Sequence, residues 1–326
     1  MRSSSAAAAT RYRPCAKPAG WPTPPSSSDS DMTRVLVTTA NGDTGRPMVD
    51  DLLEHGLQVR AMVRKDDARA QRLRDSGAEV VFGDLLTLRD VRAALDGVQR
   101  AYFNFPVGEG LVEAAVMFAQ AAKENHVELI VNMSHIQSRP QARSKATQNH
   151  WLSEQLFAWS GIPTTNLRVT FFMEWLTYIA DLIRHGRYVM PFDADSRFAP
   201  IAGSDIALTA ATILGDPERH AGRTYTLTGP VEYSHQELAA EVGRVLAKEL
   251  PFEQVTVSTF LDLLGMPDDT ARLRHFEAVT VDQREGRLAG VSGAAATITG
   301  RRLRTVEEFV DERRSLFEVG YATTSA

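Results

Sequence analysis

The sequence has almost no cysteine, no long apolar run and no excess of positive charge. Its single cysteine, Cys15, excludes an intramolecular disulfide framework and a cysteine-rich zinc site. No apolar stretch approaches the roughly 20 residues that a membrane-spanning helix needs. The formal net charge of -5 provides no basic field for nucleic acid or for an anionic membrane. We therefore expect a cytoplasmic protein that has neither as a partner.

The first 31 of the 326 residues differ from the rest. They are rich in Ser, Ala and Pro and lack apolar periodicity, which predicts a disordered leader over residues 1–31. The leader has arginines but no acidic residue before Asp29, a faint likeness to an organellar transit segment. Met32 stands directly before the first apolar run and fits instead an upstream start or an added leader.

Short β-branched runs alternate with amphipathic stretches from Arg34 to about Val169. The runs that we expect as strands are residues 35–37, 59–63, 79–82, 100–105, 128–133 and 164–169. The stretches between them carry apolar residues at i, i+3 and i+4, and several end at a glycine that can adopt the left-handed cap. This alternation predicts an α/β fold, with a doubly wound parallel Rossmann sheet over residues 32–170.

The alternation is less regular over residues 171–326. Helical stretches are expected around 174–185, 204–214 and 235–248, and a short strand at 225–229. Ser234 with Glu237, and Thr305 with Glu308, each fit a helix capping box. We expect a smaller, mostly helical lobe that closes a cleft over the strand ends, with some of its chain returning to the sheet.

The stretch TTANGDTG (38–45) lies between the first predicted strand and a predicted helix. In such a unit Gly42 would let the backbone approach a pyrophosphate, and Gly45 would let the helix pack closely on the strand. The position that usually carries the first glycine is Thr39, which can serve there only if its φ is negative. On glycine spacing alone, a cofactor site and a purely structural turn stay equally open.

The second predicted strand ends in Arg64 and Lys65, with no carboxylate at its tip. A site for NAD(H) has an acidic residue here for the ribose 2′-hydroxyl, whereas a guanidinium suits the 2′-phosphate of NADP(H). The pattern favours NADP(H) over NAD(H), although both cations could be ordinary solvated charges. Asp84, after the third strand, could accept from an adenine amino group or serve only as a turn residue.

Together with LTGPVEYSHQELAAEVG and ITGRRLRTVEEFV, these motifs resemble the NmrA-like family of atypical short-chain dehydrogenases/reductases, from about residue 33 to 317. The resemblance implies a Rossmann domain, a small C-terminal lobe and NADP(H) binding. It does not imply one activity, because the family includes quinone, triphenylmethane-dye and azo-dye reductases and also NADP-sensing regulators. Carried over by position, the cofactor contacts fall on Thr39, Ala40, Asn41, Gly42, Asp43, Thr44, Gly45, Arg64, Asp84, Asn104, Phe105 and Pro106.

Ordinary members of the wider superfamily use a serine with Tyr-x-x-x-Lys, in which the lysine lowers the pKa of the tyrosine. Ser134 ends the fifth strand as that serine should, but Ala146 and His150 stand where the tyrosine and lysine are expected. No tyrosinate chemistry is therefore visible. Tyr102, Tyr178 or Tyr188 could supply a displaced acid, and the sequence does not choose among them.

His150 and Glu154 are four residues apart and share a helix face. His150 could bind the nicotinamide ribose or donate a proton near neutral pH. The pair could instead be structural, with Glu154 capping a neighbouring loop; a metal site is disfavoured, because no third ligand is evident. His135 is a further candidate, but it should point away from Ser134 because adjacent strand residues face opposite ways. The catalytic candidates are thus Ser134 and His150, with no metal.

The segment VTFFMEWL (169–176) follows the sixth strand and should line the mouth of the cleft. Phe171, Phe172 and Trp175 offer flat apolar surfaces for an aromatic substrate, or they could form core between the lobes. We expect an NAD(P)H-dependent oxidoreductase that passes hydride to an aromatic or quinone-like small molecule. The alternative is a non-catalytic NADP(H)-sensing regulator. A homodimer stays open.

Overall fold

The computed structural model describes residues 33–267 and 269–318, so the predicted leader lies outside the described residues. Seven parallel strands form one sheet in the order β3-β2-β1-β4-β5-β6-β9. Their bounds are β1 (Arg34–Val37), β2 (Gln58–Val63), β3 (Glu79–Phe82), β4 (Arg100–Phe103), β5 (Leu129–His135), β6 (Thr164–Val169) and β9 (Thr224–Leu227). The predicted α/β class with a doubly wound parallel sheet is confirmed.

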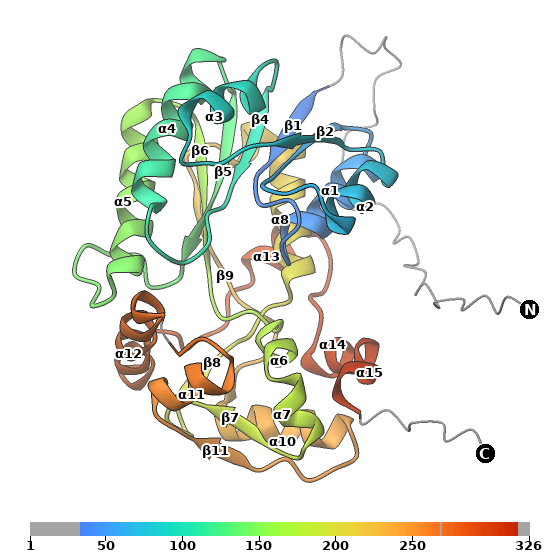
Figure 1. Ribbon diagram of the computed structural model, residues 1–326, viewed down its shortest axis with the longest axis vertical. Helices are drawn as coiled ribbons and strands as arrows, with labels where there is room; N and C mark the ends of the chain where they lie inside the picture. The colour runs from blue at the N-terminus through green and yellow to red at the C-terminus, as the bar shows by residue number, and fades with distance from the viewer. Residues whose placement is uncertain (1–32, 268, 319–326) are drawn as a thin grey trace, which may run out of the picture.

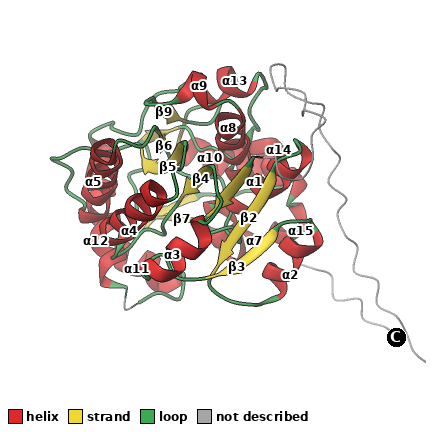
Figure 2. Ribbon diagram, turned by 90° about the horizontal axis from the view of Figure 1, so that it is seen from above, coloured by secondary structure: helices red, strands yellow, loops and turns green. Residues whose placement is uncertain are grey.

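Helices cover both faces of this sheet (Figure 2). One face is covered by α3 (Leu88–Leu95), α4 (Leu111–Glu124) and α5 (Lys145–Ser160). The other is covered by α1 (Gly45–Glu54), α2 (Ala68–Asp75), α8 (Gly203–Gly215) and α13 (Ala294–Thr299). Val35 and Val37 face the second layer and Leu36 the first, because alternate strand side chains point to opposite faces. Both faces are thus buried, as a parallel sheet requires.

The remaining chain builds a second lobe next to the sheet, drawn in the lower half of Figure 1. Its helices are α6 (Trp175–Tyr178), α7 (Ala180–Arg184), α10 (His235–Val245), α11 (Val257–Leu263), α12 (Thr270–Arg284), α14 (Val306–Glu312) and α15 (Arg314–Phe317). Its short strands pair as β7 (Tyr188–Met190) with β11 (Phe252–Gln254) and β8 (Arg197–Phe198) with β10 (Tyr233–Ser234). Both predicted capping boxes form, at the starts of α10 and α14.

The two lobes do not divide the chain at one point. After the sixth strand the chain enters the lobe, and it then returns to the sheet as α8, α9 (Pro217–His220) and β9. It returns again as α13, which packs beside α8. A boundary at residue 170 therefore divides the sequence in two, but residues after it belong to the hydrophobic core of the sheet as well as to that of the lobe. Among the described residues, no helix combines the length and apolar character needed to cross a membrane.

Candidate functional site

The glycine turn joins β1 to α1 at the carboxyl edge of the sheet. The Gly42 amide donates to the Thr39 carbonyl at 2.9 Å, which closes the turn. A Cβ at Gly45 would lie 2.8 Å from the Ala40 Cα, closer than two carbon atoms can approach. The helix therefore starts against the backbone of the turn, at residues 39 and 40, in a way that only glycine permits.

The condition that Thr39 could replace the first glycine only with a negative φ is not met, because its φ is 48°. Thr39 takes the left-handed conformation that glycine adopts freely and that costs another residue roughly 1–2 kcal/mol. Two contacts hold it there: the bond from Gly42, and a bond from Asn104 Nδ2 to Thr39 Oγ1 at 3.1 Å. The turn thus keeps the shape of a glycine-first turn without the glycine.

The start of α1 has no side-chain cap. Thr44 occupies the N-cap position but makes no capping hydrogen bond, since its hydroxyl instead bonds the Tyr102 hydroxyl of β4 at 3.0 Å. The first turn of α1 also lacks an acidic side chain. In this turn Pro47 has no N–H and the Arg46 N–H donates to the Gly42 carbonyl at 3.1 Å, so the Gly45 N–H is the one left without a partner among the described residues and available for an anion. Asn41 Oδ1, in the glycine turn, is buried, with no hydrogen-bond partner among the described residues.

The ends of β2, β3 and β4 place the other predicted cofactor residues around the turn. Arg64 and Lys65 are exposed, and Arg64 has no ion-pair partner within the described part of the chain. Asp84 accepts the Leu86 amide at 2.9 Å, so it is at least a turn residue. Asn104 binds Thr39, as above, and Phe105 and Pro106 follow it at the surface.

Ser134 is engaged inside the protein. Its hydroxyl donates to Glu154 Oε1 at 2.5 Å and bonds the Ser138 hydroxyl at 3.0 Å. Glu154 in turn accepts from the Arg168 guanidinium at 2.6 and 3.0 Å, which joins α5 to β6. The expected loop-capping role of Glu154 is therefore wrong: it forms an ion pair. No group of acidic, histidine or cysteine side chains suited to a metal ion occurs among the residues that the structure describes.

His150 is buried and lies in a cluster with two half-buried histidines. Its ring centroid is 6.0 Å from that of His135, which is 5.8 Å from that of His275 on α12. Burial, followed by the charge of a protonated His275, lowers the pKa of His150 to about 4. His150 is consequently neutral near pH 7, and the role of a charged proton donor does not fit it. Ser134 and His135 both reach α5, although the strand pattern predicts that they point apart.

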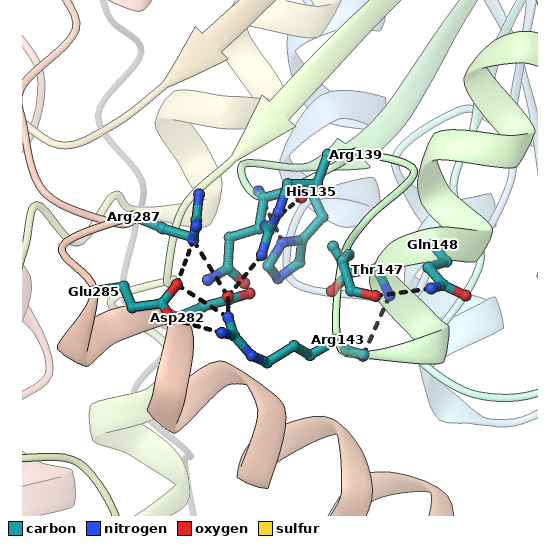
Figure 3. A network of polar contacts seen from close by, with 11 residues as sticks. His135, Arg139, Arg143, Thr147, Gln148, Asp282, Glu285 and Arg287 are labelled. Atoms are coloured by element: carbon teal, nitrogen blue, oxygen red, sulfur yellow. Dashed lines mark hydrogen bonds and ion pairs between the residues drawn. The ribbon is translucent and has the colours of Figure 1, made fainter.

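Helix α12 lies against the start of α5 (Figure 1; Figure 3), where the Ser144 hydroxyl is 2.8 Å from His275 Nδ1. Asp282 is fully buried and accepts from Arg139 Nη2 at 2.6 Å and from Arg143 Nη1 at 3.2 Å, both on the loop that follows β5. Arg143 also pairs with Glu285 at 2.6 Å. These ion pairs join α12 to the loop that precedes α5. Sequence reasoning missed these residues, because no local motif links positions more than 130 apart.

The predicted substrate residues Phe171, Phe172 and Trp175 line a small, mostly hydrophobic pocket in the C-terminal lobe. The Phe171 ring lies 5.3 Å from the Phe192 ring, and Trp175 lies 5.4 Å from Phe276 of α12. Phe172 packs instead on the core of the sheet. These aromatic residues therefore join the two lobes and line a pocket at the same time.

None of the three candidate tyrosines is an activated acid. Tyr102 and Tyr188 are fully buried, and burial raises the pKa of each. Tyr178 is 56% exposed and donates to Asp43 Oδ2 of the glycine turn at 3.0 Å. Burial, with the charge of Asp43 added, raises the pKa of Tyr178 to about 12.

A buried carboxyl group stands where the lobe meets the turn. Both Glu174 oxygens accept the Gly203 amide at 3.0 Å, and burial raises the pKa of Glu174 to about 7. In the folded protein Glu174 keeps its proton to a higher pH than in the unfolded chain. Its contribution to stability is therefore present below about pH 4.5 and is lost as the pH rises through about 7.

We expect Glu174→Gln to remove this loss. Between pH 5 and pH 8, the free energy of unfolding of the wild type should fall relative to that of the variant by on the order of 2 kcal/mol. Urea unfolding at both pH values measures the difference. Glu113→Gln, at an exposed position on α4, is the control and should follow the wild type. Parallel curves for Glu174→Gln and the wild type would contradict the assigned protonation.

A doubly wound parallel sheet with a glycine turn after its first strand defines a Rossmann-type protein. The sequence model of the NmrA-like family matches residues 31–310, and the chain belongs to this family. It is 30% identical over 290 residues to the NAD(P)H azoreductase of Xenophilus azovorans, covering 87% of this chain and 99% of the azoreductase. It is 26% identical over 245 residues to quinone oxidoreductase 2 of Escherichia coli, covering 73% and 84% of the two chains.

Solved structures of two kinds of protein share the fold. The NADPH-dependent quinone oxidoreductase of Escherichia coli complexed with NADPH superposes with a TM-score of 0.76 at 24% identity, covering 86% of this chain and 99% of that one. The negative transcriptional regulator NmrA in complex with NADP superposes with a TM-score of 0.73 at 18% identity, covering 86% and 95%. The fold therefore accommodates an enzyme and a regulator alike.

Proposed function

We propose that this protein is an NADPH-dependent reductase that passes hydride to a flat, electron-poor aromatic acceptor such as a quinone. The observation that carries the proposal is the uncapped start of α1 under a turn held by Asn104. Two findings support it: Arg64, at the end of β2, has no ion-pair partner among the described residues, and the relatives include an azoreductase and a quinone oxidoreductase. When bound, NADPH supplies the hydride.

The residues of this chain would bind and orient the cofactor. The backbone of residues 41–45 would hold the pyrophosphate, Arg64 with Lys65 the 2′-phosphate, and Asp84 the adenine. Asn104, Phe105 and Pro106 would lie along the next part of the dinucleotide. We assign the role of an acid to neither Ser134 nor His150, because both are buried and His150 is neutral near pH 7. A quinone needs none, since solvent can protonate the oxygens on which its negative charge is delocalised.

The decisive assay follows the oxidation of NADPH by the full chain with a panel of benzoquinones, naphthoquinones and one azo dye. We expect NADPH consumption that depends on both the protein and the acceptor, with much slower oxidation of NADH. The azo dye tests whether this chain shares the activity named for its azoreductase relative. Tight binding of NADPH without turnover of any acceptor would overturn the reductase proposal.

That second outcome would favour a non-catalytic NADP(H)-sensing regulator. One observation supports this alternative: Tyr178 of the lobe donates to Asp43 of the glycine turn at 3.0 Å. In a regulator, occupancy of the turn would act on the lobe through this contact. A protein partner that is retained with only one redox form of the cofactor would then identify it.

A further inference from the structure

We propose that the pocket in the C-terminal lobe binds a neutral phenol, whose hydroxyl group is held by Tyr188 and His235. This goes beyond the proposed function, because it assigns a ligand to the pocket whether or not hydride is transferred. The pocket lies where the chain leaves β6 and enters the lobe, and Phe171 and Trp175 form part of its wall.

Two buried polar side chains stand in this otherwise mostly hydrophobic wall. Tyr188 of β7 is fully buried, and its hydroxyl has no hydrogen-bond partner within the described residues. His235 of α10 is 1% exposed, and its Nδ1 likewise lacks a partner there. Buried polar atoms are nearly always paired, since an unpaired one reduces the stability of the fold. Two such atoms in one pocket indicate that a molecule from outside the chain completes them.

The neighbours of His235 determine what its free nitrogen offers. Its Nε2 lies 2.9 Å from the Gln283 side-chain oxygen, and with the amide in this orientation Nε2 carries the proton and Nδ1 a lone pair. The ring lies 5.0 Å from Phe192, nearly parallel to it, and 4.5 Å from Phe198. Burial lowers the pKa of His235 to about 4, so the ring is neutral near pH 7. The lone pair is thus held in a fixed direction.

A single partner of both atoms would therefore accept from Tyr188 and donate to His235. A hydroxyl group does both, because it has lone pairs and a proton. The aromatic rings and aliphatic side chains around the pair favour an aryl group as the rest of the molecule. A quinone carbonyl could accept from Tyr188 but would leave His235 unpaired. A phenol, or the hydroquinone formed when a quinone is reduced, satisfies both atoms.

The pocket can widen to admit such a ring. In this conformation it has room for the centre of about one water molecule, ≈10 Å³. Met173 and Met190 line it, and unbranched methionine side chains repack at low cost. A water molecule could also satisfy both polar atoms, so the experiment must separate a phenol from water.

The test compares p-cresol with 4-methylanisole, which keeps the ring and the oxygen but lacks the proton to donate. Isothermal titration calorimetry uses the full chain without dinucleotide, so the result is independent of NADPH turnover. We expect p-cresol to bind about tenfold more tightly than 4-methylanisole. Equal affinities, or no binding of either compound, would mean that the pocket holds only water, and would overturn the proposal.

Tyr188→Phe then tests the assigned residue. The variant should reduce the preference for p-cresol to less than about threefold, without lowering the midpoint of thermal unfolding, because it removes an unpaired buried group. The matched control is Tyr225→Phe. Tyr225 is on β9, and its hydroxyl bonds His220 Nδ1 at 2.9 Å. The control variant should lower the midpoint and leave p-cresol binding unchanged. Unaltered p-cresol binding in Tyr188→Phe would mean that the Tyr188 hydroxyl does not bind the phenol. If that variant does not fold, the affinities of the wild type for the two compounds still decide whether the pocket binds a phenol.

Discussion

Replacing Arg64 with alanine is expected to raise the Kd for NADPH roughly 10- to 100-fold and to leave the Kd for NADH nearly unchanged. Arg64 is exposed at the end of β2 and forms no ion pair within the described ranges, so its guanidinium is available for the 2′-phosphate. Charge-assisted, bidentate bonds of this kind are among the stronger polar contacts, and NADH lacks the group that receives them. Calorimetric titration with both dinucleotides measures the two constants.

The control for this substitution is Arg219→Ala. Arg219 is also an exposed arginine, with a side chain 73% accessible, but it lies on α9, away from the glycine turn. Arg219→Ala should change neither the Kd for NADPH nor the Kd for NADH, which separates a local contact of Arg64 from a general effect of charge. An equal loss of NADPH and NADH binding in Arg64→Ala would place the 2′-phosphate elsewhere.

Replacing Gly45 with alanine is expected to abolish dinucleotide binding and to lower the free energy of unfolding by about 1–3 kcal/mol. The new Cβ would lie 2.8 Å from the Ala40 Cα and 3.0 Å from the Thr39 carbonyl carbon. Both are backbone atoms, so the turn itself must shift, and the N–H groups at the start of α1 shift with it. Helix propensity alone predicts the opposite sign, because alanine is favoured over glycine in a helix by about 1 kcal/mol.

Gly108→Ala provides the matched control, since a Cβ there meets nothing within 4 Å. It should leave thermal unfolding and NADPH binding as in the wild type. Thermal unfolding and NADPH titration of both variants give the comparison. A Gly45→Ala protein that is more stable than the wild type and still binds NADPH would show that the close approach at this turn is not required.

The ion pairs between α12 and the loop after β5 resist separation of these two segments. Asp282 is fully buried and accepts from Arg139 and Arg143, so breaking these pairs would leave a buried charge without its partners. Any movement of α12 away from this loop, in a reductase or in a regulator, would therefore have to be driven by binding.

The sequence by itself determined the sheet, most of its helices and the two capping boxes. These features depend on side-chain periodicity and on residues within one turn of each other, such as Ser234 with Glu237. The same holds for the helix ends at Gly56, Gly77, Gly97 and Gly161, which have the predicted positive φ. It also placed Gly45 at the start of α1, where close packing on the strand requires it.

Only the tertiary structure decided the rest, because contacts between distant segments set it. The φ of Thr39 is held by Asn104, from another strand. Glu154 pairs with Arg168 of β6, and His150 is neutral near pH 7 because it is buried. The bond from Arg139 to Asp282 spans 143 positions along the chain. A local pattern specifies the backbone of each element, whereas the protonation and accessibility of a side chain depend on what the fold packs against it.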